Sequence, residues 1–154
     1  MNPDEPAMYI VFNSDLKMDW GKKIIQAVHS ACKVVINLER MFYQSLLPEP
    51  AELYDNYEKG VRSQKPSAQA LDWYAEWQKG SYVKILVKAP EPVLRDLIQR
   101  YNPYQEGRNI WLEYTIDEGR TDIPAGSLTT VVFNPAPKSQ LPKELSDRNM
   151  MKLV

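Results

Sequence analysis

The sequence predicts an α/β fold: a four-stranded mixed β-sheet with helices on both faces, in a single domain over residues 1–154. Strand-like and helix-like segments follow the order β-α-α-β-α-β-β-α, and strands separated by helices need crossovers that place helices on both sheet faces. Hydrophobic residues make up 44% of the chain and charged residues 25%, close to the average for globular proteins. A length of 154 residues suits one compact domain.

The first strand and the first helix are predicted from their apolar residues. Residues 8–13 are rich in β-branched and aromatic side chains, as buried strands are, and residues 13–15 form a turn and capping cluster. A helix is expected from about Trp20 or Gly21 to about Phe42, because apolar residues recur there at three- and four-residue spacing. We expect this apolar stripe to be buried. Its members are Ile24, Ile25, Val28, Ala31, Cys32, Val35 and Ile36.

The segment from about residue 43 to 66 is predicted to be a surface insertion, because it is acidic and rich in proline. Ser67 is then expected to cap a second helix that runs through Lys79 and ends at Gly80. The apolar residues of this helix are Leu71, Tyr74, Ala75 and Trp77.

The second half of the chain supplies the remaining elements. Residues 82–88 alternate as a strand, and Pro90 opens a helix with Val93, Leu94, Leu97 and Ile98 on its inner face. Residues 109–116 and 128–133 are predicted strands joined by a loop, so they are expected to be antiparallel neighbours. A short helix is expected near residues 140–145.

Composition excludes several classes of function. The chain has one cysteine and one histidine, which rules out an intrachain disulfide and the usual structural zinc site. No carboxylates have ligand-like spacing, so no metal site is expected. The acidic N-terminus is unlike a signal peptide, and every apolar run is too short to span a membrane, so we expect a cytoplasmic protein. A net charge of −1 means that RNA binding would need a local basic patch.

The first candidate site is residues 15–23, between the first strand and the first helix. Ligands of open α/β sheets bind beyond strand carboxyl ends, where helix N-termini offer free N–H groups, and Lys17 or Lys22 can meet phosphate or an oxyanion there. Gln26 and His29 continue along the same helix. The alternatives are solvated surface lysines and an inert histidine at the edge of the core. A His29–Cys32 nucleophilic pair is disfavoured, because a thiol on the apolar stripe is expected to be buried.

The second candidate site is the polar loop from Asp117 to Gly126. Asp117 can orient or deprotonate a water, Arg120 can pair with phosphate and Thr121 can donate a hydrogen bond. The alternative is a hairpin connection in which these side chains satisfy backbone groups.

Together the two segments resemble the type 2 peptidyl-tRNA hydrolase family. The first family motif matches Asp15-Leu16-Lys17-Met18, Gly21-Lys22, Gln26, His29 and Ala31. The second matches Asp117, Gly119-Arg120-Thr121, Ile123, Gly126 and Thr129. The resemblance covers most of the chain outside residues 43–79.

The resemblance implies hydrolysis of the ester between a peptidyl group and the tRNA 3′ ribose, by a homodimer that needs no metal or organic cofactor. Peptidyl-tRNA is then the partner. Catalytic positions of the family match Lys22, Asp117 and Thr121. Positions that support the site or bind substrate match Lys17, Gln26, His29 and Arg120.

Two departures from the family pattern leave alternatives open. Asp19 and Trp20 stand where the family has small or basic residues, and the acidic insertion can weaken tRNA docking. One alternative is a catalytically silent member of the same fold that binds RNA or a protein. Another is an adaptor with a protein partner at the insertion, using the aromatic residues Tyr54, Tyr57, Trp73, Tyr74 and Trp77; the plain reading is that these pack on the core.

Overall fold

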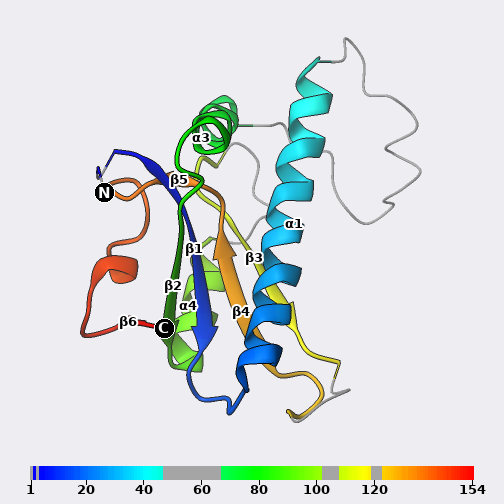
Figure 1. The fold of residues 1–154 in the computed structure, drawn as a ribbon, viewed down its shortest axis with the longest axis vertical. Coiled ribbons are helices and arrows are strands. Elements are labelled where there is room, and N and C mark those ends of the chain that lie inside the picture. Colours follow the sequence, from blue (N-terminus) through cyan, green and yellow to red (C-terminus); the bar gives the residue numbers. More distant parts are fainter. Residues whose placement is uncertain (1, 3, 47–66, 102–107, 119–122) are drawn as a thin grey trace.

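The computed structural model describes residues 2, 4–46, 67–101, 108–118 and 123–154 (Figure 1). Most of the predicted insertion, residues 47–66, lies outside the described residues. Residues 43–46 do not belong to a loop, because they continue the first helix. None of the described helices is long and apolar enough to cross a membrane.

An open mixed sheet forms the centre of the fold, in the order β3-β4-β1-β2-β6, with β5 paired to β1. β1 (Pro6–Asn13) is parallel to β2 (Lys84–Ala89) and antiparallel to β4 (Leu128–Phe133). β3 (Leu112–Ile116) is antiparallel to β4, as predicted. The prediction of four strands was wrong, because β5 (Ala136–Pro137) and β6 (Lys152–Leu153) add to the sheet. Strands of two residues are too short to show the alternation that identifies a strand.

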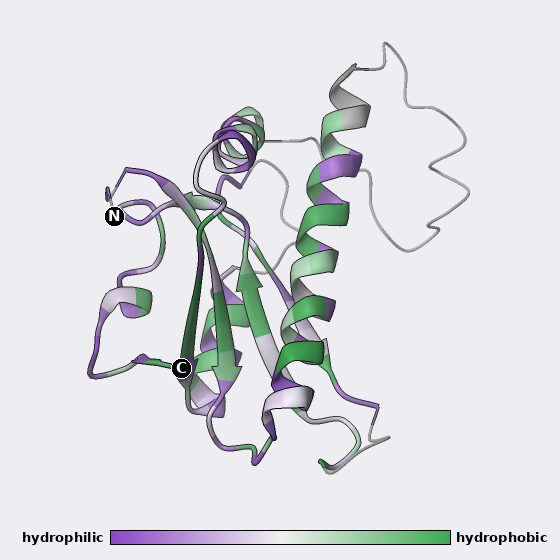
Figure 2. Cartoon of the chain, viewed as in Figure 1, coloured by the Kyte–Doolittle hydropathy of each residue, from purple (hydrophilic) through white to green (hydrophobic). Residues whose placement is uncertain are grey.

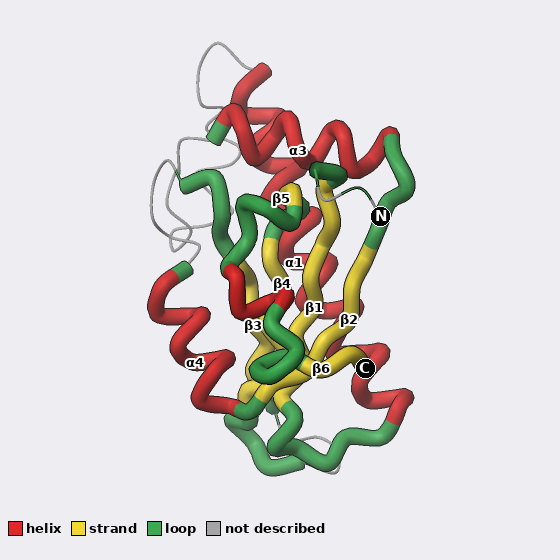
Figure 3. Tube along the Cα trace, turned by 90° about the vertical axis from the view of Figure 1, so that its left-hand side faces the viewer, coloured by secondary structure: helices red, strands yellow, loops and turns green. Residues whose placement is uncertain are grey.

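The helices begin and end near the predicted residues. α1 (Trp20–Leu46) follows β1, and α3 (Ala68–Lys79) crosses the end of the sheet where β1 begins (Figure 3). Ser67 caps α3 as predicted, since its Oγ accepts a hydrogen bond from the Ala70 amide at 3.2 Å. α4 (Glu91–Arg100) starts directly after Pro90. The predicted helix at 140–145 is a short 3₁₀ turn, η1 (Lys143–Ser146).

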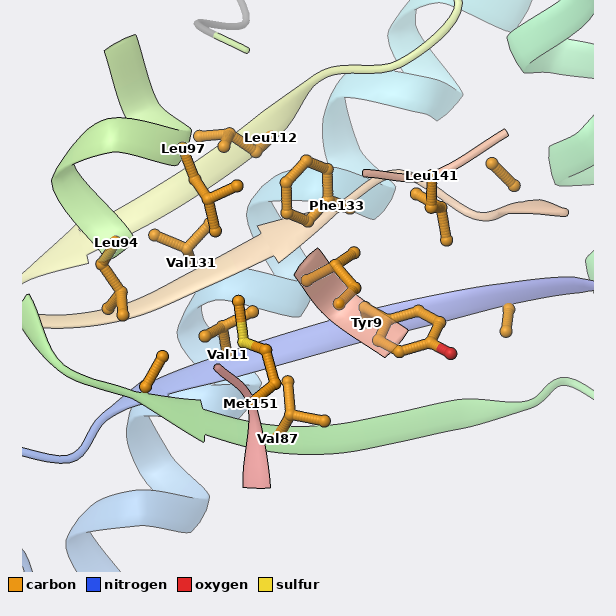
Figure 4. Close-up of a cluster of buried hydrophobic side chains, with 14 of the residues drawn as sticks. Tyr9, Val11, Val87, Leu94, Leu97, Leu112, Val131, Phe133, Leu141 and Met151 are labelled. Atoms are coloured by element: carbon orange, nitrogen blue, oxygen red, sulfur yellow. The ribbon is translucent and has the colours of Figure 1, made fainter. Parts of the chain in front are cut away.

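Hydrophobic cores cover both faces of the sheet, because alternate residues of β1 point to opposite sides. Ala7, Tyr9 and Val11 face a core completed by α4 and the C-terminal segment. Figure 4 shows this core, with Leu94 and Leu97 of α4 over Val131. Met8, Ile10 and Phe12 face the other core, which α1 and α3 cover. Helices on both faces of the sheet are therefore confirmed.

The aromatic residues of α3 belong to these cores. Trp73, Tyr74 and Trp77 are all buried, so the plain packing interpretation is confirmed for them. An adaptor surface that uses these three rings is excluded by their burial. Tyr54 and Tyr57 lie outside the described residues.

The prediction for the buried face of α1 was wrong. The residues of α1 that face the sheet form a row spaced by four, which we call the inner row: the largely buried Lys22 and the buried Gln26, Ser30, Val34 and Leu38. Ile24, Ile25, Val28, Cys32 and Ile36 of the predicted stripe are exposed instead. Ala31 and Val35 are half-buried. Figure 2 shows hydrophobic positions along much of the length of α1. Polar residues of the inner row can be buried because the sheet offers them polar partners.

Glu113 of β3 is a partly buried carboxyl group facing α1, where Asn37 Nδ2 donates to its Oε1 at 2.5 Å. Burial raises the pKa of Glu113 above its ordinary value of 4.5, against smaller opposing effects of the Lys33 charge and the Asn37 hydrogen bond. The folded state therefore binds the proton more tightly than the unfolded state. The stabilisation that this gives is present below pH 4.5 and is lost as the pH rises through the folded pKa.

Glu113→Gln is expected to increase the free energy of unfolding at pH 7, because the neutral amide needs no buried charge. The gain should shrink toward zero near pH 4, where the wild-type carboxyl group is protonated in the folded protein. Urea unfolding at both pH values measures the difference. An equal gain in the free energy of unfolding at pH 7 and at pH 4 would contradict a raised pKa of Glu113.

Candidate active site

The inner row changes in chemical character along α1. Lys22 is charged, Gln26 and Ser30 are neutral and polar, and Val34 and Leu38 are apolar. Residues spaced by four form a ridge inclined to the helix axis, and such a ridge packs along a neighbouring surface. This ridge lies against β3 and β4. The charged end of the ridge is at the helix N-terminus, where the candidate site is found.

Lys22 and Asp117 form an ion pair at this end. Lys22 Nζ donates to Asp117 Oδ1 at 2.7 Å, and the two side chains are only 12% and 8% exposed. Asp117 directly follows β3, two residues after Thr115, so both side chains point toward α1. The Asp117 backbone is held in place, since its N–H donates to the Ser127 carbonyl at 2.9 Å and its carbonyl accepts from the Gly126 amide at 2.8 Å.

Asp19 has a structural role at the start of α1. Its Oδ1 accepts a hydrogen bond from the Lys22 amide at 2.8 Å, which makes it the N-cap of the helix. A cap of this kind is worth about 1 kcal/mol, and its negative charge suits the helix N-terminus. Trp20 points to solvent, with Lys23 Nζ 5.0 Å from its ring centroid. This capping hydrogen bond explains why an acidic residue, Asp19, stands close to Lys22 in the sequence.

Gln26 is buried and holds α1 to the sheet. The Thr129 hydroxyl lies 2.7 Å from Gln26 Oε1 and 3.1 Å from the Thr115 carbonyl. These bonds tie the helix to both β3 and β4 one turn beyond Lys22. Gln26 is therefore placed to support the site rather than to form its surface.

The loop after β1 is fixed by polar side chains whose role the sequence analysis did not anticipate. Asn13 is buried, and its Nδ2 donates to the Leu128 carbonyl at 2.8 Å while its Oδ1 accepts from the Asp15 amide at 2.9 Å. Asp15 Oδ2 accepts from the first amide of α4, that of Glu91, at 2.9 Å. This acid therefore joins the candidate loop to α4. The only sign of this role in the sequence was that Asp15 belongs to the first family motif.

The remaining predicted residues are not all brought to the ion pair. Lys17 and His29 are exposed, the first in the loop before α1 and the second on the helix. Arg120 and Thr121 lie outside the described residues. Cys32 is exposed, which corrects the expectation of a buried thiol. In the described ranges, no three His, Cys, Asp or Glu side chains cluster so as to hold a metal ion.

The chain is similar to known proteins over nearly its whole length. The family model described as peptidyl-tRNA hydrolase PTH2 matches residues 7–147. A peptidyl-tRNA hydrolase of Saccharolobus islandicus is 26% identical over 144 residues, which are 94% of this chain and 98% of the relative. Those of Sulfurisphaera tokodaii and Staphylothermus marinus are 26% and 22% identical, over 94% and 92% of this chain and 97% and 92% of the relatives. Because the match to the family spans both candidate motifs, the chain belongs to the PTH2 family of peptidyl-tRNA hydrolases.

Proposed function

We propose that the Lys22–Asp117 pair is the catalytic centre at which this enzyme hydrolyses the ester joining a peptidyl group to the 3′ ribose of tRNA. The observation that carries the proposal is the 2.7 Å bond between two largely buried charged groups at the N-terminus of α1. Charged pairs of this kind are expensive to bury, and buried, closely paired charges are concentrated at functional sites.

Asp117 is proposed to position and activate the attacking water. The water oxygen bonds to the ester carbonyl carbon, and the bond from that carbon to the ribose oxygen then breaks. The proton that the water gives up ends on the departing ribose oxygen, so the products are a free carboxylic acid and a 3′ hydroxyl. A carboxylate fixed by Lys22 and by its backbone bonds can accept this proton with little reorganisation.

Lys22 is proposed to stabilise the oxyanion that forms on the carbonyl oxygen. An ammonium group has three N–H donors, so it can hold Asp117 and also donate to the oxyanion. Its largely buried position strengthens that interaction, because water screens it less. Neither step requires a metal or an organic cofactor.

The other motif residues are proposed to help in binding and stabilisation. Thr121 donates a second hydrogen bond to the oxyanion, while Lys17 and Arg120 bind phosphates near the tRNA 3′ end. Gln26 and His29 support the site from α1. For Arg120 and Thr121, which lie outside the described residues, support comes from the matched motif.

The proposal also covers the domain organisation, the cellular location and the partners of the enzyme. One sheet with a core on each face joins elements from β1 to β6, which supports a single domain over residues 1–154. Because translation produces peptidyl-tRNA, we place the activity in the cytoplasm. A protein partner at the insertion stays a prediction.

Release of tRNA from an N-blocked aminoacyl-tRNA tests the proposed reaction. We expect multiple turnovers by the purified protein at low salt and slower turnover at high salt, because salt weakens phosphate contacts. Binding of the substrate without turnover would instead favour the silent RNA-binding alternative.

A homodimer is the proposed assembly, with α1 at its interface. The outer row of α1, which we define as Trp20, Ile24, Val28, Cys32 and Ile36, is exposed and mostly apolar along the helix. Contiguous apolar surface of this kind marks interaction sites, and one patch can pack on the same patch of a second copy about a two-fold axis.

Val28→Asp at the middle of the outer row is expected to yield monomers at concentrations where the wild type is dimeric, because two carboxylates would face each other at the interface. Light scattering after size exclusion measures the mass. Lys79→Gln on the exposed end of α3 makes the same change in net charge and should stay dimeric. A wild type that is monomeric at high concentration would contradict the proposal.

A further inference from the structure

Ser30 on the inner row joins α1 to two strands at once. Its Oγ lies 2.6 Å from Thr115 Oγ1 of β3 and also bonds Thr130 Oγ1 of β4. Thr130 Oγ1 in turn lies 3.4 Å from the Gln26 carbonyl. Ser30, Thr115 and Thr130 are all buried, so these hydroxyl groups depend on one another for hydrogen bonds.

A β-bulge in β4 adds a second threonine to the face of the sheet that α1 covers. Thr115 pairs with Thr130, but Ile116 pairs with Leu128, so Thr129 is an extra residue in β4. In a regular strand, consecutive side chains point to opposite faces, whereas a bulge can turn two of them to one face. Thr129 and Thr130 accordingly both reach α1, where Thr129 contacts Gln26 and Thr130 contacts Ser30.

The hydroxyl cluster fixes the position of α1 in a way that apolar packing does not. Val34 and Leu38 hold the next part of the inner row by hydrophobic contact, which has no preferred direction. Hydrogen bonds weaken steeply when their angles change, so those of Ser30 oppose rotation and sliding of the helix. Lys22 lies on the same row of α1, and Asp117 lies two residues after Thr115, so the hydroxyl cluster joins the two segments that carry the proposed catalytic pair.

We propose that Ser30 is a positioning residue, which through Thr115 and Thr130 holds Lys22 of α1 in register with Asp117 beyond β3. This inference rests on the proposed catalytic role of the Lys22–Asp117 pair. Loss of the Ser30 hydroxyl group would change how Lys22 and Asp117 are placed for the catalytic step, while the groups that bind tRNA would stay in place. The expected signature is therefore a lower kcat at a nearly unchanged KM.

Ser30→Ala tests the proposal, with Val34→Ala as the matched control one turn along the same row. Ser30→Ala is expected to lower kcat about tenfold or more, because small misplacements of catalytic groups are costly, with KM within about twofold. The fold should survive, since Thr115 and Thr130 are cross-strand partners and their hydroxyls can bond each other. Val34→Ala removes buried apolar volume and is expected to lower the melting temperature more, yet to keep kcat within about twofold.

A second pair of variants separates the hydroxyl group from the shape of the side chain. Thr130→Val keeps the shape and loses the hydroxyl, so it should lower kcat as Ser30→Ala does; Thr130→Ser keeps the hydroxyl and should retain kcat. The inference would be overturned if folded Ser30→Ala kept the wild-type kcat. It would also be overturned if Val34→Ala lowered kcat as much as Ser30→Ala does. Asp117→Asn in the same assay separates the two claims: if it is inactive while Ser30→Ala is fully active, only the positioning role fails.

Discussion

Asp117→Asn is expected to lower kcat by about 10²–10⁴-fold, the range that proton transfer by a positioned side chain contributes. The amide oxygen can still accept the hydrogen bond from Lys22, so the fold and the place of the lysine should be retained. The amide cannot take a proton from water, and KM should change little. Steady-state hydrolysis of an N-blocked aminoacyl-tRNA measures both constants.

Asp72→Asn supplies the control for this variant. Asp72 is an exposed carboxylate on α3, and its substitution makes the same chemical change away from the site. Its kcat should equal that of the wild type. If Asp117→Asn kept more than about a tenth of wild-type kcat, Asp117 would not be the group that activates the water.

Lys22→Met is expected to reduce kcat by about 10²–10³-fold, as loss of an oxyanion donor does. It should also reduce stability, because it leaves the Asp117 carboxylate largely buried without its ammonium partner. Breaking a buried pair in this way costs roughly 3–5 kcal/mol. Urea unfolding measures the stability, and the tRNA release assay measures the activity.

The double variant Lys22→Met with Asp117→Asn separates stability from activity. With both charges removed, no unpaired charge remains buried, so most of the lost stability should return. The activity should not return, because neither catalytic group is present. A double variant no more stable than Lys22→Met would contradict the buried ion pair, and one with restored activity would contradict the catalytic role.

The four long strands and the helix starts were predictable because they carry local signals. β1 has β-branched and aromatic residues, Ser67 is a capping residue, and Pro90 suits the start of a helix. β5 and β6 were missed because pairing of such short segments depends on where the chain returns to the sheet rather than on a pattern within them.

The buried face of α1 could not be predicted from hydrophobic periodicity. Ile24, Val28 and Ile36 form a regular apolar row, yet they are exposed, while the buried Gln26 and Ser30 are polar. Buried positions of a helix usually hold apolar residues, but here threonines on β3 and β4 give the buried polar residues of α1 their hydrogen-bond partners. Thr129 faces α1 beside Thr130 because of the bulge, a feature of strand pairing that no local spacing reveals.

The centre of the candidate site was more predictable than its surroundings. Lys22 and Asp117 were both chosen from the sequence, and the structure joins them at 2.7 Å although they are 95 residues apart. The roles of Asp19 as a helix cap and of Asp15 as a link to α4 required the structure, because each depends on hydrogen-bond geometry. Thr121 and Arg120 stay predictions.

Multiple-turnover hydrolysis of an N-blocked aminoacyl-tRNA, run side by side for the wild type and the double variant, is the direct test of the proposed catalytic role of the Lys22–Asp117 pair. Circular dichroism at the assay temperature first establishes that both proteins are folded. We predict repeated release of tRNA by the wild type and only the background rate with the double variant. A folded wild type without turnover, or equal turnover by both proteins, would contradict the assignment of ester hydrolysis to the Lys22–Asp117 pair.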